Sequence, residues 1–225
     1  SIPYFWGTLG IIYNDRKVQA NEMQHWQDLW NPKWRDSLML VDSARDIMGM
    51  ALISQGHSVN TTNTAEMVAA QKKLDQLSGN VKAIVADEIK LYMIQNEAPI
   101  AVTWSGEASE MLAGNSHLHY VVPNEGGNLW FDNMVIPKTA KNKKAAYAFM
   151  NFMLRPQNAA QNAEYVGYAT PNKAAKQLLP ASIRNDRQFY PPESTIKNLE
   201  VYADLGATKV EEYNDLFLKF KMYRQ

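Results

Sequence analysis

Carboxylate and indole side chains near the ends of predicted strands are the groups of this sequence best suited to chemistry. Asp46 lies one turn into a predicted helix, and Trp104 ends a predicted strand. Trp130 and Asp132 lie two residues apart in another strand, so a period of two places both side chains on one face. Ligands of open α/β sheets bind at the carboxyl ends of strands. These four side chains are therefore candidates to line a cleft.

Asp132 carries the strongest indication of function. A carboxylate inside an otherwise apolar strand is costly unless it is paired or is solvated in a cleft. Asp46 has two interpretations, because it follows Ser43 at the predicted N-cap by three residues. The two residues could form a capping arrangement that the helix dipole favours, or Asp46 could supply a carboxylate to a cationic ligand. Both interpretations stay open from the sequence.

Patterns typical of enzymes and metal sites are weak. Ser105 lacks the flanking glycines of a G-x-S-x-G nucleophile elbow. His117 and His119 could begin a metal site, but no third ligand follows at a recognisable spacing. Asp46 and Asp132 could hydrolyse a glycosidic bond if their carboxyl groups lay about 5–10 Å apart. We expect that the protein is not an enzyme and that it binds no cofactor and no metal. The alternative is a carboxylate-pair hydrolase such as a glycosidase.

The composition argues against several classes of protein. The 225 residues include 23 basic and 23 acidic side chains, and this balance argues against nucleic acid binding. There is no cysteine and no apolar run near the roughly 18 residues that span a bilayer. Six Trp, eleven Tyr and seven Phe fit a pocket that grips its ligand by ring faces. Because the sequence starts at Ser1 without a signal-peptide pattern, we expect position 1 to be a cut made by a protease or in cloning.

The predicted elements divide the chain into an α/β part and a later, mainly helical part. Strands are predicted at residues 4–6, 10–13, 38–41, 81–85, 99–104 and 119–122, the first two flanking a glycine-rich crossing. Helices at 44–54, 63–77, 88–95 and 107–112 alternate with them, which indicates an open α/β sheet. A strand at 129–136 then precedes helices at 143–154, 156–166 and 208–222, the last with Thr208 and Glu211 as a capping pair. This change of pattern predicts two lobes.

Six blocks of sequence, in order along almost the whole chain, resemble the spermidine/putrescine-binding proteins of bacterial ABC importers. The blocks are residues 3–8 (PYFWGT), 26–30 (WQDLW), 38–46 (LMLVDSARD), 125–132 (EGGNLWFD), 151–156 (NFMLRP) and 166–172 (VGYATPN). The resemblance implies an α/β fold of the periplasmic-binding-protein type II class, whose two lobes close over a polyamine. It also implies an extracytoplasmic, non-enzymatic receptor, anchored by lipid in some relatives, that delivers its ligand to a membrane permease.

The resemblance also implies roles for individual residues. Asp132 resembles the principal partner of an ammonium group, and Asp46 resembles an acidic residue that meets an amine. Trp104 and Trp130 look like walls that pack on the methylene chain, and Tyr168 looks like an aromatic contributor from the other lobe. These roles suit a linear cation, which needs carboxylates for its ammonium groups and aromatic faces for its alkyl stem.

Three positions depart from the best-known member of the family. Ser43 stands where that protein has a carboxylate, Asp46 where it has Glu, and Tyr202 where it has Gln. We include Ser43 and Tyr202 among the predicted ligand-binding residues. Because these changes leave fewer hydrogen-bond acceptors on one side of the predicted site, the ligand could be putrescine or another polyamine as well as spermidine. A receptor for a different small solute is a further alternative.

The resemblance implies that the chain is a fragment with one near-complete lobe. Residues 10–131 plus 201–225 match the second, C-terminal lobe, and residues 1–9 plus 132–200 match the remaining part of the first lobe. Family members carry most of the first lobe before the segment that matches Ser1. We therefore expect this chain by itself to bind polyamine poorly or not at all. We also expect it to self-associate through an apolar helix face that bears Phe149, Phe152 and Met153.

Overall fold

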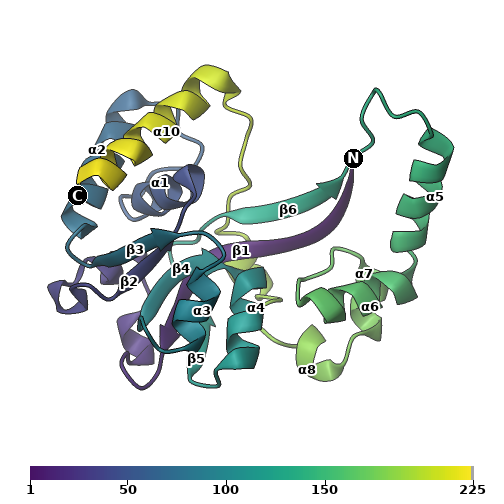
Figure 1. The fold of residues 1–225 in the computed structure, drawn as a ribbon, viewed down its shortest axis with the longest axis horizontal. Helices are drawn as coiled ribbons and strands as arrows, with labels where there is room; N and C mark the ends of the chain where they lie inside the picture. Colours follow the sequence, from purple (N-terminus) through teal and green to yellow (C-terminus); the bar gives the residue numbers. More distant parts are fainter. Residues whose placement is uncertain (224–225) are drawn as a thin grey trace.

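The computed structural model describes residues 1–223 and is built on a six-stranded mixed sheet (Figure 1). The strands are β1 (Ile2–Asn14), β2 (Leu38–Val41), β3 (Val81–Val85), β4 (Ile100–Trp104), β5 (Leu118–Val121) and β6 (Leu129–Met134). Their order is β3-β2-β4-β1-β5, with β6 paired to β1 off this path. β2 runs parallel to β3 and β4, whereas β1 runs antiparallel to β4, β5 and β6. The predicted open α/β sheet is confirmed.

The larger body of the molecule surrounds the five strands of this path with helices on both faces (Figure 1). Its helices are α1 (Ala44–Ile53), α2 (Thr64–Leu77), α3 (Ile89–Ile94), α4 (Ser105–Gly114) and α10 (Gly206–Tyr223), with 3-10 turns at Ala20–Glu22, Trp26–Trp30 and Pro32–Trp34. Along β2, Leu38 and Leu40 belong to the core under α1, α2 and α10, while Met39 belongs to the core under α3 and α4. Both faces of β2 are therefore buried under helices, as its continuous apolar sequence indicates.

β1 corrects the prediction of two short strands that flank a glycine-rich crossing. It is one strand of 13 residues that changes its neighbours along its length. Residues 2–8 pair with β6, and residues 9–14 pair with β4 and β5. Gly10 instead allows the backbone of β5 to approach β1 closely, because a Cβ at Gly10 would lie 2.5 Å from the carbonyl oxygen of Val121.

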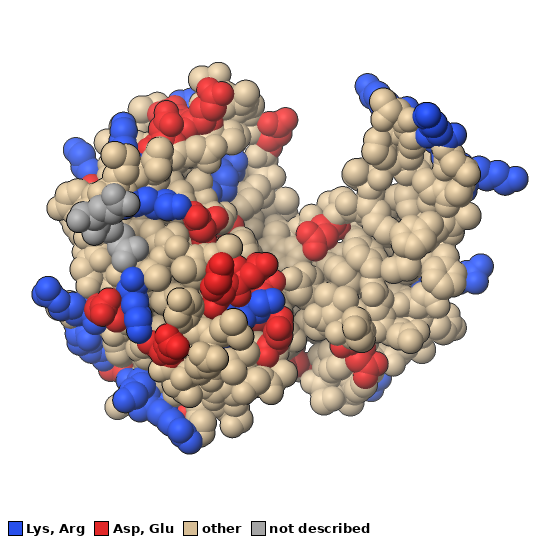
Figure 2. Space-filling view, in the orientation of Figure 1, with Lys and Arg blue, Asp and Glu red and all other residues tan. Residues whose placement is uncertain are grey.

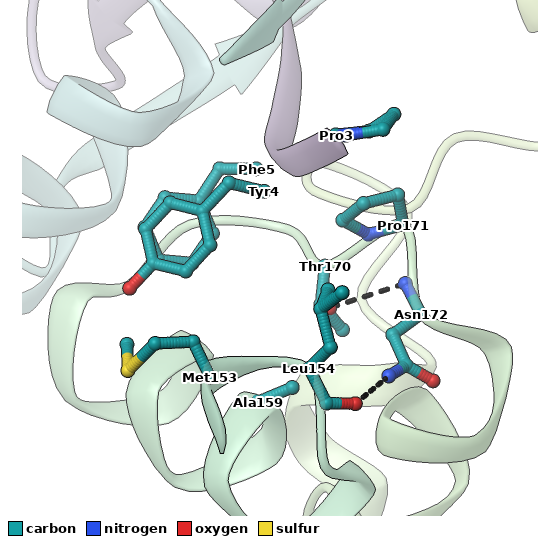
Figure 3. A pocket seen from close by; sticks show the side chains of 9 residues that line it. All are labelled: Pro3, Tyr4, Phe5, Met153, Leu154, Ala159, Thr170, Pro171 and Asn172. Carbon is teal, nitrogen blue, oxygen red and sulfur yellow. Dashed lines mark hydrogen bonds between the residues drawn. The ribbon is translucent and has the colours of Figure 1, made fainter. Parts of the chain in front are cut away.

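The smaller body contains the first half of β1, β6 and a group of helices (Figure 1). Its helices are α5 (Lys143–Met153), α6 (Pro156–Val166), α7 (Lys173–Leu178), α8 (Ala181–Arg184) and α9 (Glu193–Ile196). Its core is small and rich in alanine, and consists of Phe5, Ala159, Ala160, Ala163, Ala169, Ala175, Leu179 and Tyr190. A mostly apolar pocket of about 310 Å³ lies beside this core, with Tyr4 and Phe5 on one side and Met153 and Leu154 on another (Figure 3).

Three stretches of chain join the two bodies: β1, β6 and residues 197–205, which follow α9 and lead into α10. α10 begins at Gly206, two residues before the predicted capping pair of Thr208 and Glu211, so that part of the prediction is wrong. Figure 2 shows a hollow between the two bodies on the face in view, with Lys and Arg side chains along the outer edge of the smaller body. Within residues 1–223, no helix combines the length and the apolar character that a membrane-spanning segment needs.

The predicted lobe boundaries stay a prediction. The last two residues of the segment 201–225 lie outside the described residues.

Candidate functional site

A cavity of about 310 Å³ lies where the two bodies meet. It is lined by Trp104, Glu107, Trp130, Asp132 and Tyr168. Trp104 ends β4, Glu107 lies in the first turn of α4, Trp130 and Asp132 lie on β6, and Tyr168 follows α6. Four of the predicted binding residues thus meet around one cavity, from segments far apart in the sequence.

Two glycines leave room for two aromatic rings of the cavity. Trp130 lies opposite Gly7 in the β1–β6 pair, and a Cβ on Gly7 would lie 2.3 Å from its ring. A Cβ on Gly106 would likewise lie 2.3 Å from the ring of Tyr168. The two rings meet edge to face with their centroids 5.7 Å apart. Side chains at these glycines would displace the rings, since real Cβ atoms do not approach so closely.

Two side chains near the cavity, those of Trp130 and Ser105, form hydrogen bonds with the backbone of Thr8 on β1. The indole N–H of Trp130 donates to the carbonyl oxygen of Thr8 (3.3 Å), and the backbone N–H of Thr8 donates to Ser105 Oγ (3.1 Å). Ser105 is buried and opens α4. Its hydroxyl therefore ties the start of this helix to the strand that crosses between the bodies.

Asp132 presents a carboxylate without a partner within residues 1–223, since no hydrogen bond or ion pair of its side chain occurs there. It lies opposite Phe5 in the β1–β6 pair. As the period of two predicts, Trp130 and Asp132 line the cavity while Phe131 between them does not. Partial burial raises the pKa of Asp132, because the cavity wall solvates the charged form less well than water does. An added cation would relieve this cost.

Glu107 is a second carboxylate of the cavity. It was not among the predicted site residues, because the sequence pattern indicated only that it begins a helix. Its Oε1 accepts a hydrogen bond from the Tyr168 hydroxyl (2.9 Å), and its Oε2 lies 3.1 Å from Lys90 Nζ. Burial and the nearby charge of Glu107 raise the pKa of Tyr168, so the hydroxyl stays protonated and donates. The signal was present in the sequence: Glu107 follows Trp104 by three residues, in the first turn of a helix that begins at the strand end.

The remaining predicted site residues form a second cluster behind Trp104. Asp46 Oδ2 accepts hydrogen bonds from Ser43 Oγ (2.6 Å) and Trp104 Nε1 (3.2 Å), and its Oδ1 accepts one from the Tyr202 hydroxyl (2.8 Å). Burial raises the pKa of Asp46, and these hydrogen bonds oppose that rise. Ser43 is the N-cap residue by position, but its side chain bonds to Asp46 rather than to the helix backbone. Of this cluster, only Trp104 lines the cavity.

The histidine pair lies elsewhere. His117 Nδ1 and His119 Nε2 each lie 2.9 Å from one carboxylate oxygen of Asp15. Among residues 1–223, no group of three or more His, Cys, Asp or Glu side chains is placed to hold a metal ion.

Comparison with known proteins identifies the family. Residues 1–191 match the family model described as bacterial extracellular solute-binding protein. The chain is 40% identical over 224 residues to the spermidine/putrescine-binding periplasmic protein of Escherichia coli K12, a match that covers 100% of this chain and 64% of that protein. The chain therefore spans less than two thirds of the length of this curated relative.

Solved structures show the same fold. The spermidine/putrescine ABC transporter substrate-binding protein from Streptococcus pneumoniae superposes with a TM-score of 0.91 and 56% identity, over 100% of this chain and 69% of that chain. The PBP MotA from A. tumefaciens B6, solved in complex with glucopine, reaches a TM-score of 0.74 at 14% identity, over 99% of this chain and 69% of that one, and so shares the fold alone. The predicted type II periplasmic-binding-protein fold is confirmed. The chain belongs to the bacterial extracellular solute-binding proteins.

Proposed function

We propose that this chain is part of the substrate-binding component of a polyamine ABC importer, and that it binds spermidine, putrescine or a related linear polyamine between two lobes. The observation that carries the proposal is the carboxylate of Asp132, which has no partner among residues 1–223 and lies in a cavity walled by Trp104, Trp130 and Tyr168. The relatives from Escherichia coli and Streptococcus pneumoniae, both named for spermidine and putrescine, support it.

The chemistry of the cavity favours a cation with an apolar stem. An ammonium group on Asp132 would supply the charge-assisted hydrogen bonds that the carboxylate lacks. The faces of Trp104 and Trp130 would cover methylene groups, and an ammonium group over a ring face would add a cation–π attraction of about 0.5–2 kcal/mol. Glu107 offers a second negative charge on the same cavity, although Lys90 and Tyr168 already bond to it. We assign Asp132 the principal ammonium, the aromatic residues the stem, and Glu107 a supporting charge.

The setting of the receptor is part of the proposal. We place the protein outside the cytoplasm, in the periplasm or on the cell surface as a lipoprotein, where it would deliver its ligand to an ABC permease. The name of the Escherichia coli relative, a periplasmic protein, supports this location. We assign residues 10–131 plus 201–225 to one lobe and residues 1–9 plus 132–200 to the other, and we infer that lobe closure captures the ligand.

A hydrolase is less well supported. A carboxylate pair must face one substrate bond from both sides. Asp132 lines the cavity, but Asp46 is buried, accepts three hydrogen bonds from its own chain and does not line the cavity. We therefore propose binding without bond chemistry. Direct contact of Ser43 and Tyr202 with a ligand stays a prediction.

The test is isothermal titration calorimetry of the protein at its full natural length with putrescine, spermidine and spermine. We expect at least one of them to bind, and Asp132→Asn to weaken it by about 10- to 100-fold, since a hydrogen bond to a charged group contributes about 1.5–3 kcal/mol. The matched control is Asp215→Asn on the exposed side of α10, which should leave binding unchanged. Absence of binding by all three polyamines, with binding of another solute from a ligand panel, would overturn the proposal.

A further inference from the structure

The Asp46 carboxylate joins three separate stretches of the chain, and one of them is a wall of the cavity. We infer that Asp46 is a positioning residue, which fixes the Trp104 indole and anchors the connecting segment 197–205 through Tyr202 without touching the ligand. This inference rests on the proposed polyamine function and assigns to Asp46 a role other than the ammonium contact expected from the sequence.

The Asp46 carboxylate is buried and already accepts hydrogen bonds from the protein. Asp46 is only 5% exposed. Its donors are the Ser43 hydroxyl, the Trp104 indole N–H and the Tyr202 hydroxyl, at 2.6, 3.2 and 2.8 Å. Two carboxylate oxygens offer roughly four lone-pair positions. Three of these are therefore directed to groups of the protein itself.

Trp104 faces both the cavity and Asp46. Its side chain lines the cavity, while its indole N–H, the only polar group of that side chain, donates to Asp46. The hydrogen bond to Asp46 favours one orientation of the ring, and a ring held in its bound orientation loses less conformational entropy when a ligand packs on it.

Tyr202 belongs to a connecting segment that the larger body holds at several points. Besides the bond to Asp46, the neighbours of Tyr202 are held by Asn60, which donates to the carbonyl oxygen of Val201 (2.9 Å) and accepts from the backbone N–H of Ala203 (2.8 Å). The guanidinium of Arg45 lies 4.5 Å from the centre of the Tyr202 ring. This segment is one of the three connections between the bodies. Asp46 therefore couples a wall of the cavity to a connection on which the arrangement of the bodies depends.

A double-mutant cycle separates positioning from direct contact. Putrescine and spermidine affinities are measured by calorimetry for the wild type, Trp104→Phe, and Trp104→Phe with Tyr202→Phe, each with and without Asp46→Asn and all at full natural length. If Asp46 acts through the Trp104 indole N–H and the Tyr202 hydroxyl, Asp46→Asn weakens both ligands about three- to tenfold, and this effect becomes smaller once Trp104 is Phe and disappears once Tyr202 is Phe as well. A loss that persists when both Trp104 and Tyr202 are Phe, or no loss in the single variant, overturns the inference.

A ligand-free measurement keeps this test independent of the proposed function. With ¹⁵N-labelled tryptophan, the indole N–H resonance that disappears in Trp104→Phe is that of Trp104. It should move in Asp46→Asn and stay in place in the control Asp215→Asn. A resonance that does not move in Asp46→Asn overturns the inference even if polyamines bind. If the wild type binds no polyamine while the resonance moves, the proposed function fails and the hydrogen bond stands.

Discussion

The two bodies of the molecule bury their apolar side chains to very different extents. In the larger body, the four residues of β2 are all buried and are covered by helices on both faces. In the smaller body, the core consists mainly of alanine, and large apolar side chains remain exposed on its helices. Those on α5, α6 and α7 are Tyr147, Phe149, Phe152, Tyr165, Val166 and Leu178. The pocket in Figure 3 lies in the same body.

This difference determines how firmly each wall of the cavity is held. Trp104 and Glu107 come from β4 and α4, which pack in the larger body. Tyr168 comes from the smaller body and is held at the cavity by its bond to Glu107 and by edge-to-face contacts with Phe5 and Trp130. The cavity thus combines a wall that packs in the larger body with a wall that rests on a smaller core.

The largest expected effect is on the stability of the larger body. We expect Leu40→Ala, at a fully buried position on β2, to lower the free energy of unfolding by about 3 kcal/mol through lost burial and a cavity. The matched change in the smaller body is Leu178→Ala, at a side chain that is 54% exposed, and it should cost less than about 0.5 kcal/mol. Urea denaturation measures both. Equal costs would show that the two bodies do not differ in packing as described.

The same difference explains which elements the sequence could predict. Strand β2 follows the predicted bounds, because a short apolar run between turn residues has few alternatives in a buried sheet. Strand β3 also follows the predicted bounds, although it contains Lys82 and only Val81 is buried. The continuity of β1 could not be predicted in this way. Residues 2–8 are held in the strand by β6, which lies more than a hundred residues later in the sequence. Local patterns carry no information about such a partner.

The site was predictable in part for a related reason. Alternation within β6 correctly places Trp130 and Asp132 on one face, because a strand's period is local. Which carboxylate lines the cavity is decided by tertiary contacts instead. Asp46 is turned into the protein by donors from Trp104 and Tyr202, whereas Glu107, which looked like an ordinary residue in a first helical turn, lies on the cavity.

The junction between the bodies should tolerate added volume poorly. We expect Gly7→Ala to lower the free energy of unfolding by about 1–3 kcal/mol, because the new Cβ would lie 2.3 Å from the Trp130 ring and 2.4 Å from Ser105 Oγ. Gly79→Ala is the matched control, since nothing lies within 4 Å of a Cβ there. Urea denaturation and the near-ultraviolet circular dichroism of the tryptophans report the two effects. If Gly7→Ala and Gly79→Ala unfold at the same urea concentration with the same spectra, the ring does not depend on the glycine.

We expect the exposed face of α5 to drive weak self-association of this chain. Phe149 and Phe152 are 59% and 50% exposed, and contact between copies would remove them from water. Phe149→Ser with Phe152→Ser should raise the dissociation constant at least about tenfold, as measured by sedimentation velocity across concentrations. The control is Leu218→Ser with Met222→Ser on α10, two side chains of similar exposure in the larger body. A wild-type chain that sediments as a monomer at every concentration contradicts this prediction.

The smallest effect concerns charge at the junction. Burial raises the pKa of Asp132 above its ordinary value of 3.8, so ionisation costs the folded state stability that the unfolded state does not lose. As the pH rises through the ordinary value and then through the raised one, the wild type should lose stability relative to Asp132→Asn. Because the side chain is exposed to solvent, the difference at neutral pH should stay below about 1 kcal/mol, and it should vanish below the ordinary pKa.

The pKa of Glu22, on the larger body, is shifted in the opposite direction to that of Asp132. A hydrogen bond from Lys33, with a further one from the backbone of Gln19, lowers the pKa of Glu22. The ionised carboxylate therefore stabilises the folded state above the ordinary pKa, and Glu22→Gln should be less stable than the wild type at neutral pH but not in acid. Thermal denaturation from pH 3 to 7 measures both variants. If Asp132→Asn is destabilised in the same direction as Glu22→Gln, the Asp132 carboxylate has a partner, and the cavity loses the free negative charge on which its proposed ligand depends.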